Sequence, residues 1–292
     1  MIVDYLIIGA GRSGTTTVYK YLEQHNEICF STIKEVHYFS VDDLFSRGQK
    51  YYHSFFENCS SKKVIVAADT YLFIDHDVIK RIYDYNPNMK FLVMLRNPVD
   101  RAFSGYSYAI NNGHLSSDIS FLQSIENEKS LLFSSSIQVK NNLCNVYQSF
   151  YNEHISKWTE VFPKKNFLLL RTKDLKNNPT QFLAKISDFL NVSDFNISKE
   201  FKANSAKAVK SKNLELQLLN RDTFLRKIIR TIVPGFIKKG IFKSGLVDKI
   251  HELNKSDAKI IKLTDEERES VEKLFVEDLK LLHENFNISF ND

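Results

Sequence analysis

The stretch that decides the fold reads VDYLIIGAGRSGTTTVYKYLEQ and covers residues 3–24. It opens with an apolar run at residues 3–8, which is typical of a strand buried in a parallel sheet. Three glycines follow within six positions, and residues 15–24 then repeat apolar side chains at helical spacing. The stretch therefore predicts a strand, a glycine-rich loop and a helix that starts where the loop ends.

The rest of the chain repeats this alternation. Apolar runs of strand length occur at residues 28–30, 63–68, 91–95 and 167–170. Helical spacing occurs at residues 77–85, 144–160 and 179–190. Strands that alternate with helices predict an α/β fold, in which a central parallel β-sheet is flanked by helices.

A helix near the end of the chain has a clear start signal. Thr264 and Glu267 form a capping-box pattern. An apolar stripe follows at Val271, Leu274, Phe275, Leu279 and Leu282. We expect a single P-loop-like domain over residues 1–292, with a nucleotide-binding core at 1–210 and a helical, basic C-terminal part at 211–292.

Composition excludes several classes of protein. With 43% hydrophobic and 26% charged residues the chain is globular, and no apolar run approaches the roughly 18 residues of a membrane-spanning helix. Its three cysteines, Cys29, Cys59 and Cys144, are far apart and odd in number. The pattern predicts neither a disulfide framework nor a metal-binding pair, so we expect reduced thiols and a cytoplasmic protein.

Positive charge is concentrated toward the C-terminal third. Residues 199–262 hold 16 Lys and Arg against 6 Asp and Glu, whereas the whole chain carries only +5. Such a segment favours an anionic ligand, an anionic polymer or an acidic membrane surface, and a solvated helix face explains the charge equally well. Residues 224–243 alternate basic and apolar side chains and are the candidate for peripheral membrane contact.

The glycine loop fits two templates. Gly9, Gly11 and Gly14 match the GxGxxG pattern of dinucleotide-binding folds. Glu35 lies about where such folds place their ribose-binding carboxylate. This interpretation predicts an NAD- or FAD-dependent oxidoreductase.

The second template is the P-loop, in which Gly9 and Gly14 bracket the turn. Thr15 replaces the lysine that would reach the β- and γ-phosphates of a triphosphate. The hydroxyls of residues 15–17 and the backbone N–H groups remain at the helix start, and Arg12 supplies charge from inside the loop. This interpretation predicts a nucleotide with a single 5′-phosphate.

A second anion site is expected after the run at 91–95. Arg96 follows that strand directly, and ligands of open α/β sheets bind outside the carboxyl ends of strands. Ser104 lies in the first turns of the next helix and can share a phosphate with Arg96. We interpret Asp100 and Arg101 as local charges of the helix start.

The segment KEVHYF, residues 34–39, follows the second strand and should lie near the same sheet edge. Glu35 and His37 are two residues apart and share a face in extended backbone. Either side chain could take a proton from an acceptor group.

Four segments together carry a family resemblance: RSGTT at 12–16, KEVHYF at 34–39, RNPVDRAFS at 96–104 and WTEVFPKKNFLLLRTKDLKNNP at 158–179. In this order the chain resembles the sulfotransferases that use 3′-phosphoadenosine 5′-phosphosulfate (PAPS). It is most similar to the carbohydrate branch, which includes heparan sulfate sulfotransferases and bacterial relatives. The resemblance covers about residues 3–210.

The resemblance implies how the donor is bound. The 5′-phosphate would be held by Arg12, Ser13, Gly14, Thr15, Thr16 and Thr17, and the 3′-phosphate by Arg96 and Ser104. The late loop of the family is matched loosely by residues 204–210, where Lys207 or Lys210 would reach the nucleotide. The product would be adenosine 3′,5′-bisphosphate (PAP), and no metal is required.

The resemblance also implies the roles around the acceptor. Glu35 would deprotonate an acceptor hydroxyl or amine, with His37 as a second candidate base. Arg12 stands where the family usually has Lys, and it would stabilise charge on the bridging oxygen as the sulfuryl group leaves. Lys34, Asp69 and Tyr71 would line the acceptor site.

These roles predict a bacterial, PAPS-dependent sulfotransferase that sulfates a saccharide or glycan and has no nucleic-acid partner. Two alternatives remain open on the sequence. One is the oxidoreductase that the GxGxxG pattern predicts, and the other is a non-catalytic anion-binding or membrane-surface protein that uses the basic segment.

Overall fold

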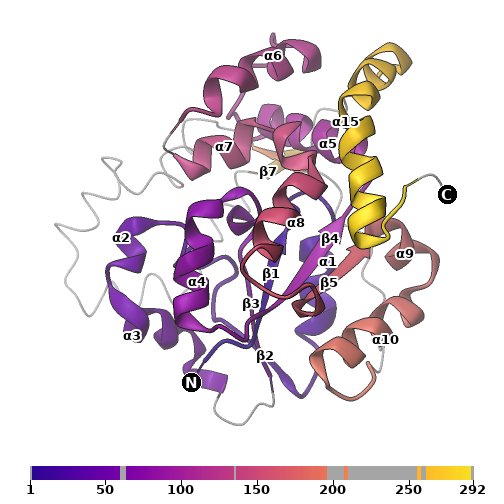
Figure 1. The fold of residues 1–292 in the computed structure, drawn as a ribbon. Coiled ribbons are helices and arrows are strands. Elements are labelled where there is room, and N and C mark those ends of the chain that lie inside the picture. The colour runs from indigo at the N-terminus through magenta and orange to yellow at the C-terminus, as the bar shows by residue number, and fades with distance from the viewer. Residues whose placement is uncertain are drawn as a thin grey trace, which may run out of the picture.

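The computed structural model describes residues 2–59, 64–134, 136–195, 207–209, 255–257 and 261–290. Five strands form one parallel sheet: β1 Tyr5–Gly9, β2 Ile28–Phe30, β3 Val64–Ala68, β4 Lys90–Leu95 and β5 Phe167–Arg171. Their order across the sheet is β2-β3-β1-β4-β5 (Figure 1). The predicted α/β fold with a central parallel sheet is confirmed.

Helices make up most of the remaining described chain. The α-helices are α1 Thr15–Leu22, α2 Asp42–Phe45, α3 Gly48–His53, α4 Ile79–Tyr85, α5 Pro98–Asn111, α6 Phe121–Leu131, α7 Ile137–Leu143, α8 Tyr151–Thr159, α9 Thr172–Asn177, α10 Pro179–Leu190 and α15 Asp265–Phe286. Short 3₁₀ turns are η1 Ser54–Cys59, η2 Thr70–Ile74, η3 His76–Val78, η4 Tyr147–Ser149 and η5 Lys164–Asn166. A separate antiparallel pair joins β6 Lys207–Val209 to β7 Lys255–Asp257.

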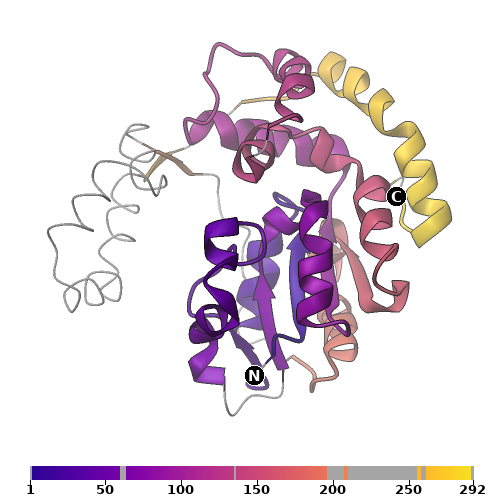
Figure 2. The same cartoon turned by 60° about the vertical axis from the view of Figure 1, so that its left-hand side comes forward.

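The two faces of the sheet carry separate apolar cores, as the alternation along β1 shows. Leu6 and Ile8 face a core completed by α4 and α8, whereas Tyr5 and Ile7 face a core completed by α1 and α10. A third core joins α5, α6 and α15. Helices α5, α6 and α7 thus lie beyond the carboxyl ends of the strands, at the top of Figures 1 and 2.

Local capping explains why several helices begin where the sequence predicts. The Thr264 hydroxyl accepts from Glu267 N, and the Glu267 side chain accepts from Thr264 N, so the predicted capping box at the start of α15 is confirmed. The predicted helix at 179–190 coincides with α10, which has Pro179 in its first turn and the Asn178 side chain as its cap.

Two local predictions are wrong. The helix expected over 144–160 is split, because the backbone of Phe150 leaves the helical region (ψ 78°) between η4 and α8. Leu274 was expected on the apolar stripe of the last helix, but it is 46% exposed. Val271, Phe275 and Leu282 of the expected stripe are buried, because α15 packs against α8 and α5 on that face.

The expectation of three reduced cysteines is also wrong. Cys29 on β2 and Cys59 at the end of η1 form a disulfide, with Cα atoms 5.5 Å apart. The two residues are 30 positions apart, so only the packing of η1 against β2 brings them together. Cys144 is a buried free thiol. Within the described ranges, no helix is both long and apolar enough to cross a bilayer.

Candidate active site

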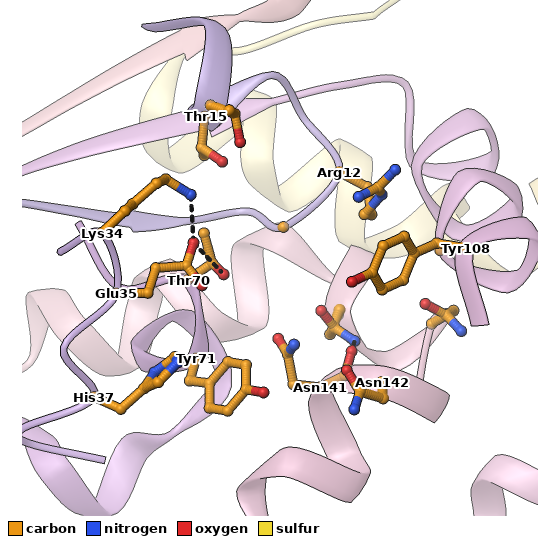
Figure 3. Close-up of a pocket in the computed structure, with 15 residues that line it drawn as sticks. Arg12, Thr15, Lys34, Glu35, His37, Thr70, Tyr71, Tyr108, Asn141 and Asn142 are labelled. Carbon is orange, nitrogen blue, oxygen red and sulfur yellow. Dashed lines mark hydrogen bonds and ion pairs between the residues drawn. The ribbon is translucent and has the colours of Figure 1, made fainter. Parts of the chain in front are cut away.

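A cavity of about 460 Å³ lies at the carboxyl ends of β1, β2 and β3 (Figure 3). The loops after these strands form one side, and α5, α7 and the η4 region form the other. The lining residues are Gly11, Arg12, Thr15, Thr16, Lys34, Glu35, His37, Thr70, Tyr71, Gly105, Tyr108, Asn141, Asn142, Asn145 and Gln148. Strand ends of an open α/β sheet are where ligands of such folds bind.

The glycine loop turns sharply into α1. Gly14 caps the helix with φ 90°, a left-handed conformation that favours glycine. Arg12 has φ 67°, and its guanidinium lies 4.3 Å from the centre of the Tyr108 ring on α5. The Thr172 hydroxyl lies 2.6 Å from the carbonyl oxygen of Ser13 and fixes the loop from the β5 side. The loop therefore presents the N-terminus of α1 to the cavity, where an anion is favoured.

The loop residues predicted to bind the 5′-phosphate fall into two groups, those that line the cavity and those that do not. Arg12, Thr15 and Thr16 line the cavity. Ser13 is fully buried beneath the loop, and Thr17 is half-buried in the first turn of α1. These two residues support the loop in this structure, and their predicted contact with a 5′-phosphate stays a prediction.

The loop after β2 holds Glu35 in an uncommon backbone conformation. Glu35 has φ 59° and His37 has φ 56°, both in the left-handed region that β-carbons disfavour. The loop is anchored because Glu35 N donates to the carbonyl oxygen of Ala68 at 3.0 Å. Strained non-glycine residues persist where packing forces them and cluster at functional sites. Here they turn the Glu35 carboxylate toward the glycine loop.

Two neighbours engage the Glu35 carboxylate (Figure 3). Lys34 Nζ lies 2.5 Å from Glu35 Oε1, and the Thr70 hydroxyl donates to the same oxygen at 3.4 Å. The other carboxylate oxygen has no hydrogen bond among the described residues. Glu35 can therefore accept a proton or a hydrogen bond from a group in the cavity.

His37 forms a second candidate base with a buried carboxylate behind it. His37 Nδ1 lies 2.9 Å from Asp69 Oδ1, and Asp69 is 5% exposed. Asp69 also accepts from the Tyr71 backbone N–H and the Ser40 hydroxyl. Asp69 lies behind His37 and does not line the cavity, and its predicted contact with an acceptor stays a prediction.

Tyr71 lines the cavity, with its ring stacked on His37 at 4.2 Å, and its predicted contact with an acceptor stays a prediction. Burial raises the pKa of the Tyr71 hydroxyl, and the nearby carboxylates of Glu35 and Asp69 raise it further. The phenol is therefore a protonated hydrogen-bond donor at neutral pH.

A second cavity of about 280 Å³ opens between the ends of β4 and β5. Arg96, Arg171, Lys173 and Lys176 line it, so it is strongly basic. It adjoins the first site through Thr172, which lines it and bonds the glycine loop. The structure thus places the predicted Arg96 in an anion-attracting pocket next to the loop.

Ser104 and the late lysines are placed differently from Arg96. Ser104 is half-buried on α5 and lines neither cavity. Lys207 begins β6, which approaches α5, and Lys210 lies outside the described residues. The roles predicted for these three residues stay predictions.

The interpretation of Arg101 as a local helix-start charge is wrong. Arg101 is fully buried and donates to the carbonyl oxygen of Gly11 at 3.4 Å and to Gln148 Oε1 at 3.0 Å. It also donates to the Asn145 carbonyl oxygen and to Asn145 Oδ1, at 2.6 and 3.3 Å. Asp100 fits the interpretation better, since it pairs with Arg268 at the surface. Arg101 therefore joins the glycine loop to the opposite cavity wall.

Several cavity residues escape the sequence interpretation. Tyr108 is four residues after Ser104 on one helix, so helical spacing could have found it. Arg171 directly follows the predicted strand at 167–170, and the strand-end rule could have found it. The amide wall of Asn141, Asn142, Asn145 and Gln148 has no such signal, because tertiary packing alone brings it opposite Glu35.

No group of three or more His, Cys, Asp or Glu side chains in the described parts of the chain is arranged to hold a metal ion. The polar groups of the site are instead hydroxyls, amides, one imidazole, one carboxylate and basic side chains. This donor set suits an anionic organic ligand.

Comparison with known proteins identifies the family. The model of the sulfotransferase domain family matches residues 3–265, and the chain belongs to this family. The chain is 24% identical over 187 residues to heparan sulfate glucosamine 3-O-sulfotransferase 5 of Mus musculus, which covers 64% of this chain and 53% of the relative. It is 27% identical over 202 residues to the human bifunctional heparan sulfate N-deacetylase/N-sulfotransferase 2, covering 65% of this chain and 22% of that protein.

Solved structures agree on the fold. A sulfotransferase from Alicyclobacillus acidocaldarius superposes with a TM-score of 0.67 at 19% identity, over 99% of this chain and 98% of the other. Mouse sulfotransferase SULT7A1, solved in complex with PAP, gives 0.52 at 18% identity, over 95% and 85% of the two chains. The chain spans about half the length of the heparan sulfate 3-O-sulfotransferase it matches.

The oxidoreductase alternative is wrong. Besides the family match, the strand order differs from that of dinucleotide-binding folds, in which β2 lies beside β1. Here β3 lies between β1 and β2. The loop after β2 reaches the cavity across the end of β3, where Glu35 N donates to the carbonyl oxygen of Ala68. Glu35 is therefore not placed as a ribose-binding carboxylate at the end of a neighbouring strand.

Proposed function

We propose that this chain is a PAPS-dependent sulfotransferase that transfers the sulfuryl group to a hydroxyl or amine of an acceptor, with Glu35 as general base. One observation carries the proposal: the anion-binding loop with Arg12 and the carboxylate of Glu35 line the same cavity. A transfer site needs a cradle for the donor's anionic group and a proton acceptor within reach of the nucleophile.

The residues present fit this donor. The loop offers Thr15, Thr16 and the start of α1 to a single 5′-phosphate, while the basic pocket at Arg96 offers charge to a 3′-phosphate. Thr15 stands where a triphosphate-binding loop would have lysine, which fits a nucleotide without a γ-phosphate. Ser104, Lys207 and Lys210 would complete the 3′-phosphate site.

PAPS supplies an activated sulfuryl group when bound. The acceptor oxygen or nitrogen forms a bond to sulfur while the bond from sulfur to the bridging oxygen of the phosphate breaks. Glu35 takes the proton of the acceptor, and Arg12 stabilises the negative charge that develops on the leaving phosphate. Lys34 Nζ, 2.5 Å from Glu35, neutralises charge between the base and the donor loop.

His37 offers a second candidate base because Asp69 can stabilise its protonated form. The left-handed backbone of both residues does not distinguish them. Glu35 interacts electrostatically with Arg12 in the donor loop and pairs with Lys34, which favours Glu35 as the base. We therefore assign His37 to positioning of Tyr71, on which it stacks.

The acceptor is proposed to be a saccharide or glycan. The support comes from two relatives, a heparan sulfate glucosamine 3-O-sulfotransferase and a heparan sulfate N-deacetylase/N-sulfotransferase. The amides and tyrosines of the cavity wall can each donate and accept hydrogen bonds, as the hydroxyls of a saccharide do.

The test separates chemistry from donor binding. Glu35→Gln should reduce sulfuryl transfer from PAPS about 10²–10⁴-fold, the usual contribution of a general base. The dissociation constant of PAP, measured by calorimetry, should stay within about twofold of the wild-type value. The matched control is His37→Gln, which should cost less. Transfer retained in Glu35→Gln, with transfer lost in His37→Gln, would reverse the assignment of the base.

A further inference from the structure

The cavity wall opposite Glu35 is built from side chains without charge. Helix α7 and the turn after it contribute Asn141, Asn142, Asn145 and Gln148, and α5 contributes Tyr108. The charged lining groups all lie on the other side or on the donor loop: Lys34 is paired with Glu35, and Arg12 lies over the Tyr108 ring. Among the lining residues that the structure describes, Lys34 and Arg12 are the cations, and both are engaged on the side of Glu35 and the donor loop, away from the amide wall.

Two of the four amides are occupied by the fold. Gln148 Nε2 donates to the carbonyl oxygens of Lys140, Asn141 and Cys144, at 3.3, 2.8 and 3.1 Å, and so fixes the C-terminal turn of α7. Its Oε1 and the Asn145 side chain accept from Arg101, which also bonds Gly11 in the donor loop. The position of α7 is therefore tied to the donor loop through Arg101.

The other two amides are unoccupied within the described chain. Asn141 Oδ1 is buried and accepts no hydrogen bond there. Neither the Asn142 side chain nor the Tyr71 hydroxyl has a partner among the described residues. Figure 3 shows the polar ends of Asn141, Tyr71 and Tyr108 turned toward the interior of the cavity, facing the side on which Glu35 lies. A buried acceptor without a partner is costly, which favours a ligand that satisfies it.

We propose that Asn141 and Asn142, with the Tyr71 hydroxyl, form the acceptor subsite and select an uncharged, hydroxyl-bearing acceptor over a polyanionic one. The inference rests on the proposed sulfuryl transfer. An amide donates and accepts, and a phenol does both, so together they match sugar hydroxyls. A carboxylate or sulfate on the acceptor would lose its hydration against this wall and would meet Glu35 without a free cation beside it.

The direct test compares one oligosaccharide acceptor with and without its charged carboxyl groups. Initial rates of transfer from PAPS are measured on a heparosan tetrasaccharide and on the same tetrasaccharide after reduction of its carboxyl groups to hydroxymethyl. We expect kcat/KM to be at least about tenfold higher for the reduced, neutral form, with little dependence on salt. Equal or faster transfer to the acidic form, or no transfer to the neutral one, overturns the inference.

Variants locate the effect on α7. Asn141→Leu and Asn142→Leu should each raise KM for the neutral tetrasaccharide about tenfold while kcat changes less, because a binding contact is lost. The midpoint of thermal unfolding should not fall in Asn141→Leu, since the buried Asn141 oxygen has no partner to lose. Asn127→Leu, an exposed asparagine on α6, is the matched control and should leave KM unchanged. Unchanged KM in both cavity variants would also overturn the inference.

PAP binding separates the two claims. If PAP binds and only the acidic tetrasaccharide is sulfated, the proposed function stands and the neutral subsite is refuted. If PAP does not bind, the proposed function fails first.

Discussion

Arg101 offers a quantitative test of how the site is held together. Its guanidinium is fully buried and makes four hydrogen bonds, to Gly11, Gln148 and twice to Asn145. Burial lowers the pKa of Arg101 to about 10, so the side chain remains charged at neutral pH. Arg101→Lys keeps the charge but replaces a planar fork of donors with a single ammonium group.

The expected cost follows from the bonds that lysine cannot remake. An ammonium at this position can serve about two of the four acceptors, which leaves about two buried oxygens without a partner. Each hydrogen bond to a charged group contributes about 1.5–3 kcal/mol, so the loss of two should lower the free energy of unfolding of Arg101→Lys by about 3–6 kcal/mol.

The assay is urea unfolding followed by circular dichroism, with the midpoint and the slope compared between variants. Arg268→Ala is the control, because it removes the exposed partner of the neighbouring Asp100 and should cost no more than about 1 kcal/mol. A loss below about 1 kcal/mol for Arg101→Lys, or an equal loss in both variants, would refute the assignment of Arg101 as the link between loop and wall.

Two further predictions concern the same wall. A Cβ at Gly105 would lie 1.9 Å from Asn145 Oδ1, so Gly105→Ala should destabilise the fold by about 1–3 kcal/mol in urea unfolding, and a neutral result would show that Asn145 moves freely. Burial raises the pKa of Glu128, which accepts from Val146 N and Tyr147 N, to about 7. The folded state then keeps a proton that the unfolded state has lost, so this contribution to stability is full below about pH 4.5 and disappears as pH rises through 7. The unfolding free energy should fall by about 3 kcal/mol more in the wild type than in Glu128→Gln between pH 4.5 and 8, and parallel pH profiles would contradict the account.

Sequence patterns predict the strands and helices of the α/β fold because periodicity and capping signals are local. The apolar run before the glycine loop, the short strand at 28–30 and the proline-led helix at 179–190 all appear where periodicity and capping place them. The same holds for Arg12 and Glu35, since both follow strands of one parallel sheet, whose carboxyl ends lie at the same edge.

The parts that escape prediction depend on contacts between distant segments. Nothing near Arg101 in the sequence indicates that Gly11 and Asn145 will be its partners, and a charged residue at a helix start is ordinarily solvated. The disulfide of Cys29 and Cys59 depends likewise on the packing of η1 against β2. The amide wall follows from the position of α7, a short helix with no buried residue and hence a weak periodic signal.

The central claim is that the two adjoining cavities hold a nucleotide with a 5′-phosphosulfate and a 3′-phosphate. Calorimetric titration with PAP, with ATP and NAD as controls, tests it most directly. We expect tight binding of PAP, weak or no binding of ATP and NAD, and a loss of about 10–100-fold in PAP affinity in Arg96→Ala, since one charge-assisted contact is removed. Tight binding of NAD or ATP without PAP, or PAP affinity unchanged in Arg96→Ala, would contradict the account.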